Sequence, residues 1–313
     1  MSRKIPILVI AGPTGVGKTA LSLVLAKKFN GQVINADSMQ VYRGLDIGTG
    51  KILPHQMQGV PHHLIDTCHP ADNYDASRFQ ADANDLIHSI DQAGHLPILV
   101  GGTGLYLEGL LYDLSFGGAQ SLDPAYRRHL EERAEKEGPQ VLWDELQAKD
   151  PQASQAIPVQ NVRRTIRALE VIDQTGQLFS QQKDREDRQH RYREFLMVLN
   201  RPRPQLYDAI NQRVLEMVDQ GLEAEVRNLI DLGIDSQASS MRGIGYKEWL
   251  PYFAGEADLQ TTIEAIQINS RHYAKRQLTW FRNRMVDQHW LDVSQDNYQQ
   301  VAIDWVQEFL QAK

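Results

Sequence analysis

The sequence predicts an α/β fold in which a parallel sheet is flanked by helices and interrupted by an inserted all-helical domain. In the first hundred residues, short apolar runs alternate with helical patterns, which is typical of βαβ units. From about residue 117 to 193, charged helical patterns replace the strand patterns. An apolar run at 195–199 then resumes the strand pattern. The sheet-forming core is therefore expected to be discontinuous in sequence.

Apolar spacing along the chain predicts the individual elements. We expect strands at 5–10, 32–35, 97–100 and 195–199, a helix over the sheet at 76–87, helices between 205 and 232, and a long helix through 267–284. The expected domains are 1–116 together with 194–313 for the core, and 117–193 for the insertion. The very polar end of the insertion, 183–193, is expected to be mobile.

Composition excludes several classes of protein. The 313 residues are 42% hydrophobic and 23% charged, which describes a globular chain of one large or two modest domains. No apolar run approaches the length that spans a bilayer, and the N-terminus leads into a strand rather than a signal sequence, so we expect a cytoplasmic protein. The single cysteine, Cys68, excludes an internal disulfide and a zinc site built on several thiolates.

The most specific motif is the glycine-rich loop GPTGVGKT between the first expected strand and the following helical pattern. The glycines let successive backbone N–H groups point at a polyphosphate, the lysine adds a charge, and the threonine hydroxyl can hold Mg²⁺. The motif predicts a P-loop, kinase-like sheet of the ATP-binding type, without identifying the phosphate compound. The residues expected to bind phosphate are Gly12, Pro13, Thr14, Gly15, Val16, Gly17, Lys18 and Thr19, with Thr19 as the magnesium ligand.

Two further strand ends should lie beside this loop, because parallel strands joined by right-handed crossovers end at one edge. Asp37 follows the second strand, and Gly101 to Thr103 follow the third. An Asp facing a phosphate site can accept a proton from an attacking nucleophile, although an Asp after a strand also commonly forms a turn or caps a helix. A Walker-B strand would carry an Asp where this chain has Gly101 and Gly102, which weakens the case for an ATP-hydrolysing protein and leaves a small P-loop kinase as a competitor.

The net charge of −7 conceals basic segments. Residues 271–284 hold five Lys or Arg and no acid. On a helix, one face would carry Arg271, Lys275 and Arg282, and another Tyr273, Gln277 and Trp280. A second cluster at 163–167 contains three arginines, for which a solvated helix face is the simpler interpretation.

Six motifs in chain order resemble those of bacterial tRNA dimethylallyltransferases. They are GPTGVGKT, DSMQVY at 37–42 with DIGT at 46–49, GGTGLY at 101–106, residues 164–170, GIGYKE at 243–248 and AKRQLTWFR at 274–282. The resemblance implies transfer of the dimethylallyl group from dimethylallyl diphosphate to N6 of the adenosine immediately 3′ of the anticodon in tRNA. The P-loop would then bind a departing diphosphate with Mg²⁺, and not ATP.

The resemblance also implies roles for individual residues. Asp37 would be the general base, Thr103 would lie near the reacting amine, and Arg213 would contact the diphosphate, with an ordinary surface arginine as the alternative for Arg213. The residues implied in tRNA binding are Asp37, Ser38, Met39, Gln40, Gly104, Arg127, Arg163, Arg164, Arg167, Arg242, Gly243, Gly245, Tyr246, Lys247, Lys275 and Arg276. The expected partners are the anticodon stem-loop of tRNA and dimethylallyl diphosphate, with no membrane and with a monomeric protein. Eukaryotic relatives add a C-terminal zinc finger, so the single cysteine supports the bacterial form.

Other functions stay open at this point. A small-molecule kinase would also use the P-loop, and a nucleotide-gated RNA-binding protein without chemistry would not need Asp37. A prenyltransferase acting on free AMP or ATP is a further alternative, which the arginines of the insertion argue against.

Overall fold

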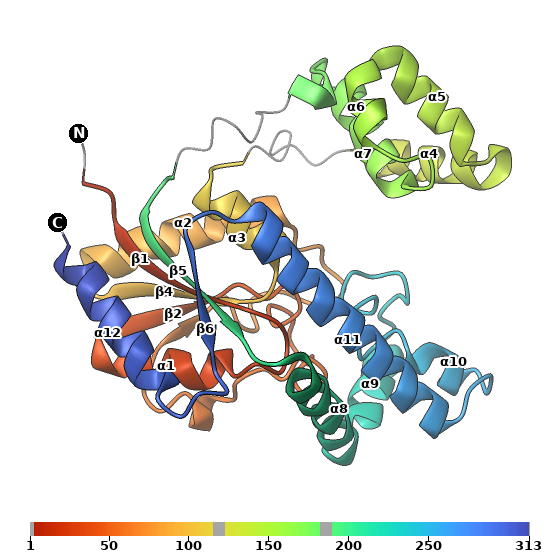
Figure 1. The fold of residues 1–313 in the computed structure, drawn as a ribbon. Helices are drawn as coiled ribbons and strands as arrows, with labels where there is room; N and C mark the ends of the chain where they lie inside the picture. The colour runs from red at the N-terminus through yellow and green to blue at the C-terminus, as the bar shows by residue number, and fades with distance from the viewer. Residues whose placement is uncertain (1–2, 115–122, 182–189, 313) are drawn as a thin grey trace. The chain divides into compact units, whose positions relative to one another are not determined.

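The computed structural model describes residues 3–114, 123–181 and 190–312. The chain forms two compact units, one of residues Met1–Leu111 with His190–Lys313 and the other of residues Tyr112–Gln189 (Figure 1). The expected boundaries were 116/117 and 193/194, so the contacts begin and end the inserted unit a few residues earlier. The polar segment expected to be mobile falls largely outside the described residues, and its last residue, Arg193, begins a strand.

Unit 1 is built on a six-stranded parallel sheet with the strand order β3-β2-β4-β1-β5-β6. The strands are β1 Pro6–Ala11, β2 Gly31–Asn35, β3 His62–His63, β4 Leu96–Gly101, β5 Arg193–Asn200 and β6 Gln288–Asp292. The predicted α/β fold with a parallel sheet and the four predicted strands are confirmed. The central register pairs Leu8 with Ile98 on one side and with Phe195 on the other, so the chain returns from the insertion directly beside β1.

The helices of unit 1 flank this sheet or lie beyond its carboxyl-terminal edge (Figure 1). They are α1 Lys18–Lys28, α2 Ala76–Gln92, α3 Gly104–Leu111, α8 Arg203–Asp219, α9 Leu222–Asp231, α10 Trp249–Phe253, α11 Leu259–Arg284 and α12 Tyr298–Gln311, with a 3₁₀ turn at Pro54–Gln56. Leu8 and Ile10 of β1 pack with buried side chains of α1 and α12. On α2, Phe79 and its neighbours one helical turn apart are buried, and the Phe79 ring stacks on Tyr106 of α3 with centroids 4.4 Å apart.

Unit 2 is helical throughout its described residues. Its helices are α4 Pro124–Glu137, α5 Pro139–Lys149, α6 Pro151–Ala156 and α7 Val162–Thr175, followed by a 3₁₀ turn at Phe179–Gln181. Three of them begin with proline, whose fixed φ and missing N–H suit the first helical position. Leu130, Leu142, Leu146, Ile166 and Leu169 form its apolar core. Over the described ranges of both units, every helix is too short or too polar to cross a lipid bilayer.

Candidate active site

The carboxyl ends of β1, β2 and β4 meet at a cavity of about 440 Å³, which we call the P-loop pocket. Its walls come from the loop before α1, the segment after β2, a turn at 48–50, helices α8 and α11, and the segment 242–247. Among the described residues that line it, Asp37 is the one carboxylate, whereas the cations are Lys18, Arg213, Arg242, Lys247 and Arg276. The pocket is therefore positive overall and suits an anionic ligand.

The glycine-rich loop adopts the conformation expected of a phosphate-binding loop. Gly17 precedes α1 with a φ of 101°, a left-handed conformation that favours glycine. A Cβ on Gly12 would lie 2.8 Å from the carbonyl oxygen of Leu199, so this part of the loop packs closely on β5. Thr14 to Thr19 line the pocket, whereas Gly12 and Pro13 lie behind it and present their carbonyl groups to Lys18.

Lys18 is held inside the loop. Its Nζ donates hydrogen bonds to the carbonyl oxygens of Gly12, at 3.0 Å, and Pro13, at 2.8 Å. Burial lowers the pKa of Lys18 to about 8, against a raising effect of Asp37 and a further lowering effect of Arg213. An anion bound beside Lys18 would favour its charged form, so this lysine is suited to holding phosphate oxygens.

Arg213 extends from α8 into the P-loop pocket, which rules out the alternative of an ordinary surface arginine. Its Nη2 donates to the carbonyl oxygen of Thr49 at 3.1 Å, and its Nη1 lies 3.4 Å from Thr14 Oγ1. Burial lowers the pKa of Arg213, while the charge of Asp37 raises it. The guanidinium thus contacts the phosphate-binding loop and lies within range of the charge of Asp37.

Asp37 forms a turn and also lines the pocket, so its turn-forming role is confirmed and its role as a base stays a prediction. Its Oδ1 accepts a hydrogen bond from the backbone N–H of Met39 at 2.9 Å. The next residue, Ser38, donates its backbone N–H to Thr103 Oγ1 at 3.1 Å. The ends of β2 and β4 are therefore joined at the point where Asp37 enters the pocket.

Two site residues on α11 were not assigned from the sequence. Gln277 is buried, accepts the backbone N–H of Thr14 at 3.1 Å and donates to the carbonyl of Gly102 at 2.9 Å. Tyr273 lines the pocket, and burial followed by the charge of Asp37 raises its pKa to about 12, so its phenol remains protonated at neutral pH. Helical periodicity placed both on another face of this helix than the basic residues. It gave no indication that this face meets a loop more than 250 residues away in sequence.

Most of the expected RNA-contacting residues of unit 1 lie around the same pocket. Those lining it are Asp37, Ser38, Met39, Gln40, Arg242, Gly243, Gly245, Lys247 and Arg276. Gly104 lies beneath the ring of Trp280, where a Cβ would be 2.4 Å from Cδ1.

The assignment of Tyr246 to RNA binding requires correction. Its side chain is completely buried and donates its hydroxyl to Glu225 at 2.7 Å, because the ring fills the core behind the turn at 48.

The arginines predicted in unit 2 divide into two kinds. Arg163 and Arg164 of α7 are exposed. Arg127 of α4 instead forms two hydrogen bonds, of 2.8 and 2.7 Å, with the completely buried carboxylate of Glu170. Arg167 lies 3.9 Å from the same carboxylate. Arg127 thus neutralises a buried acid, while its side chain remains 43% exposed, so its assignment to RNA binding stays a prediction.

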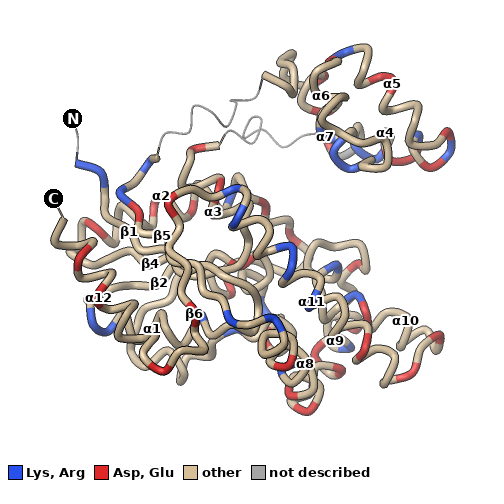
Figure 2. The backbone as a smooth tube through the Cα atoms, in the orientation of Figure 1, with Lys and Arg blue, Asp and Glu red and all other residues tan. Residues whose placement is uncertain are grey.

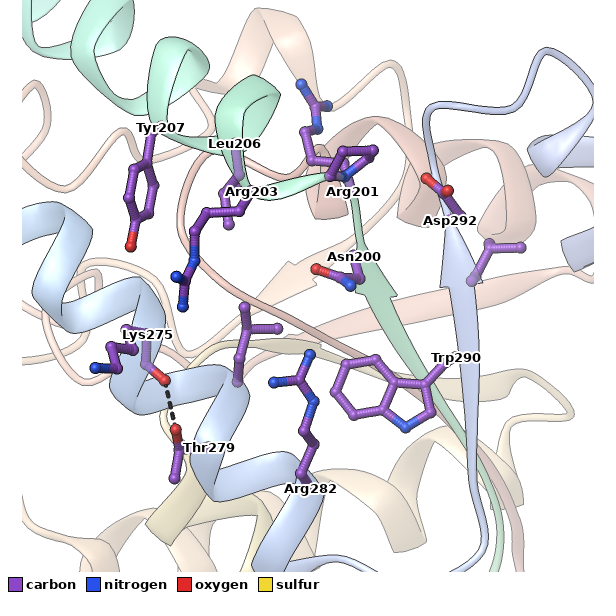
Figure 3. Close-up of a pocket in the computed structure, with 13 residues that line it drawn as sticks. Asn200, Arg201, Arg203, Leu206, Tyr207, Lys275, Thr279, Arg282, Trp290 and Asp292 are labelled. Carbon is purple, nitrogen blue, oxygen red and sulfur yellow. Dashed lines mark hydrogen bonds between the residues drawn. The ribbon is translucent and has the colours of Figure 1, made fainter.

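A second cavity, of about 460 Å³, lies between α8, α11 and β6 (Figure 3). We call it the basic pocket; its charged and aromatic lining residues are Arg201, Arg203, Tyr207, Lys275, Arg282, Trp290 and Asp292. The guanidinium of Arg282 lies 5.2 Å from the centre of the Trp290 ring, and that of Arg203 lies 5.9 Å from the Tyr207 ring. Figure 3 shows Arg203, Arg282 and the amide of Asn200 directed toward a common space.

The basic face predicted for the long helix is confirmed for Lys275 and Arg282, which both line the basic pocket. Tyr273 and Gln277, on another face of α11, line the P-loop pocket. Figure 2 shows the Lys and Arg positions distributed along this helix. One helix therefore separates two positively charged cavities.

Comparison with known proteins identifies the family. The family model described as IPP transferase matches residues 40–284. The tRNA dimethylallyltransferase of Limosilactobacillus reuteri is 47% identical over 96% of this chain and 99% of its own length, and that of Geobacillus thermodenitrificans is 46% identical over 98% and 96%.

Solved structures agree with these relatives. The full-length tRNA isopentenylpyrophosphate transferase of Bacillus halodurans superimposes with a TM-score of 0.74 at 43% identity, covering 98% of this chain and 97% of that one. A eukaryotic dimethylallyltransferase acting on tRNA gives a TM-score of 0.82 at 30% identity, covering 99% and 80%. The chain therefore belongs to the IPP transferase family, together with the tRNA dimethylallyltransferases.

Proposed function

We propose that this protein transfers the dimethylallyl group of dimethylallyl diphosphate to N6 of the adenosine immediately 3′ of the anticodon in tRNA, releasing diphosphate. The observation that carries the proposal is the composition of the P-loop pocket. It combines a phosphate-binding loop, a half-buried lysine and a half-buried arginine with one carboxylate, Asp37, in a single cavity. Family membership supports the same activity.

The P-loop side of the pocket would hold the diphosphate. As the allylic carbon separates from its oxygen, negative charge develops on the leaving group, so cations fixed beside it lower the barrier. Lys18 supplies one charge, and the fork of Arg213 supplies another above Thr14. Thr19, in the first turn of α1 and in the lining of the pocket, offers the hydroxyl oxygen that Mg²⁺ takes as a ligand. Together with diphosphate oxygens, it would hold a magnesium ion that adds further charge stabilisation.

Asp37 would act as the general base. The exocyclic amine of adenine is a weak nucleophile because its lone pair is delocalised into the ring. As N6 bonds to the allylic carbon and the carbon–oxygen bond breaks, the amine proton would pass to the Asp37 carboxylate. Thr103 fixes Ser38 beside it, and Tyr273 provides a protonated phenol at the same wall, so the acceptor would be oriented as well as deprotonated.

The RNA would be held by cationic surfaces around this pocket and on the insertion. The target adenine must leave its stack to enter a cavity, as for other enzymes that act on a base. Arg242, Lys247 and Arg276 lie in the wall of the P-loop pocket, and Arg163 and Arg164 are exposed on α7. The basic pocket adds arginines and aromatic rings, a combination that suits single-stranded nucleotides. A monomeric state and a cytoplasmic location stay predictions.

The test is mass analysis of an anticodon stem-loop after incubation with dimethylallyl diphosphate and Mg²⁺. We expect one added dimethylallyl group on the adenosine 3′ of the anticodon, and a loss of product for Asp37→Ala. Free AMP and ATP serve as competing acceptors in a parallel reaction. Absence of RNA product at every magnesium concentration would refute the proposal, and ADP release that depends on a small acceptor would establish a kinase instead.

A further inference from the structure

We propose that Glu225 of α9 is a positioning residue for both substrates, because it fixes the turn at 46–49 on which Arg213 and Gln40 rest. The proposal depends on the diphosphate-binding role proposed above for Arg213. Glu225 does not line the P-loop pocket and would touch neither substrate. It would act through the backbone of the turn.

The carboxylate of Glu225 accepts four hydrogen bonds. Its Oε2 accepts the backbone N–H groups of Asp46, at 2.9 Å, and Ile47, at 2.7 Å. Its Oε1 accepts the backbone N–H of Gly48 at 3.0 Å and the hydroxyl of Tyr246 at 2.7 Å. Hydrogen bonds to an ionised acceptor are stronger than those between neutral groups, so one side chain fixes three consecutive peptide groups.

One carbonyl group of the turn contacts side chains of the site. The carbonyl oxygen of Thr49, the residue after Gly48, accepts hydrogen bonds from Arg213 Nη2 at 3.1 Å and from Gln40 Nε2 at 3.2 Å. Arg213 is the expected diphosphate ligand, and Gln40 is one of the expected RNA contacts. A displacement of the turn would therefore move the support of both side chains together.

The packing around the turn leaves little room for displacement. Gly50 has a φ of 58°, and a Cβ there would lie 1.9 Å from Arg213 Nη2. A Cβ on Gly48 would lie 2.6 Å from the Tyr246 ring. The guanidinium lies directly on bare backbone, so its position follows that of the turn.

A second residue, Lys51, holds the start of the turn through contacts that do not involve Glu225. Lys51 is buried, and its Nζ lies 2.6 Å from Asp46 Oδ1, 2.5 Å from Asp66 Oδ1 and 2.9 Å from the carbonyl of Tyr42. Lys51 holds the Asp46 side chain, whereas Glu225 holds the peptide N–H groups. Loss of Glu225 should thus loosen the turn without releasing the segment as a whole.

The experiment measures binding of inorganic pyrophosphate, with Mg²⁺, to the full-length chain by calorimetry. Glu225→Gln keeps the side-chain shape but turns an NH₂ group toward donors that need an acceptor, and we expect about tenfold weaker binding. Arg213→Gln should weaken binding about 10- to 100-fold. The double variant should bind no more weakly than Arg213→Gln alone, because Glu225 acts through Arg213. Glu223→Gln is the matched control: it lies two residues earlier on α9, pairs at the surface with Arg227, and should bind as the wild type does.

The outcomes separate this inference from the proposed function. If Arg213→Gln leaves pyrophosphate binding unchanged, the assigned diphosphate site is wrong. If Arg213→Gln weakens binding while Glu225→Gln stays folded and binds normally, only the role of Glu225 is overturned. The role of Glu225 would also be overturned if the loss of pyrophosphate affinity in the double variant equalled the product of the two single losses. Such a result would indicate that Glu225 and Arg213 act independently.

Glu225→Gln could fail to fold, in which case Tyr246→Phe tests the same contact. It removes one of the four donors and retains the ring in the core. We expect about threefold weaker pyrophosphate binding with a normal thermal unfolding midpoint, and no additional loss in combination with Arg213→Gln. Unchanged binding in Tyr246→Phe would overturn the proposal.

Discussion

Replacing Lys18 by methionine should stabilise the ligand-free protein at neutral pH. Burial lowers the pKa of Lys18 from 10.5 to about 8 in the folded chain. At about 1.4 kcal/mol per tenfold change in proton affinity, keeping the lysine charged in this position costs about 3 kcal/mol of folding free energy. Methionine removes the charge but also loses the hydrogen bonds to Gly12 and Pro13, each worth about 1 kcal/mol. The expected net gain at pH 7 is therefore about 1–2 kcal/mol.

The difference in free energy of unfolding between Lys18→Met and the wild type should become smaller as the pH rises. Because the folded pKa lies below the unfolded value, the folded state binds fewer protons than the unfolded state between about pH 8 and 10.5. The free energy of unfolding of the wild type should then rise, relative to Lys18→Met, as the pH increases through this window. Below pH 8 the difference should be constant and should favour the variant.

Urea unfolding of both proteins at pH 7, 8, 9 and 10 measures this difference, since effects shared by the two chains cancel. Lys18→Met should no longer bind pyrophosphate. Lys18 would then be required for ligand binding although it lowers the stability of the ligand-free protein. A lower stability of Lys18→Met at pH 7, or a difference that does not change between pH 8 and 10, would refute the reasoning.

Two further predictions concern the Arg127–Glu170 pair and the basic pocket. Arg127→Met should destabilise unit 2 by about 3–5 kcal/mol in thermal or urea unfolding, because it removes both hydrogen bonds of the buried Glu170 carboxylate and leaves only Arg167, at 3.9 Å, beside it. Arg127→Met combined with Glu170→Leu should recover most of the loss, and equal destabilisation in the single and double variants would contradict this. Arg203→Gln and Arg282→Gln should each weaken stem-loop binding and reduce the salt slope of log K by about 1, with an unchanged KM for dimethylallyl diphosphate. The exposed Lys28→Gln is the control, and a change in KM without a change in RNA affinity would argue against an RNA contact.

The sequence predicts the parts of the fold that repeat a local pattern. The strands at 5–10 and 97–100 are continuous apolar runs because both faces are buried, and the P-loop combines glycine, lysine and threonine at fixed spacing. Strand β6 was missed because in QHWLD only Leu291 is buried. Strand β3 was missed because two residues are too short to show a period.

The site was predictable where chemistry is local to a motif and unpredictable where it depends on distant partners. Asp37 and Lys18 are recognisable from the residues around them. Tyr246 was misassigned because its motif gives no information about Glu225, the acid that accepts its hydroxyl 21 residues earlier in sequence. The ion pair of Arg127 was equally unpredictable, since its partner Glu170 lies 43 residues away on another helix. In both cases a distant tertiary contact determines the hydrogen-bond partner of a polar side chain.

The amide of Gln277 limits which residues evolution can place at this position of α11. Its oxygen accepts a hydrogen bond from the backbone N–H of Thr14, and its NH₂ group donates one to the carbonyl of Gly102. A glutamate would bring a negative charge against that carbonyl, a lysine or arginine would have no acceptor for Thr14, and a leucine would leave both backbone groups buried without partners. The mutational tolerance of this site should consequently be as narrow as that of a residue that contacts substrate. Saturation mutagenesis scored by activity would then rank Gln277 with the P-loop, because its side chain joins the helix to the segments that follow two strands.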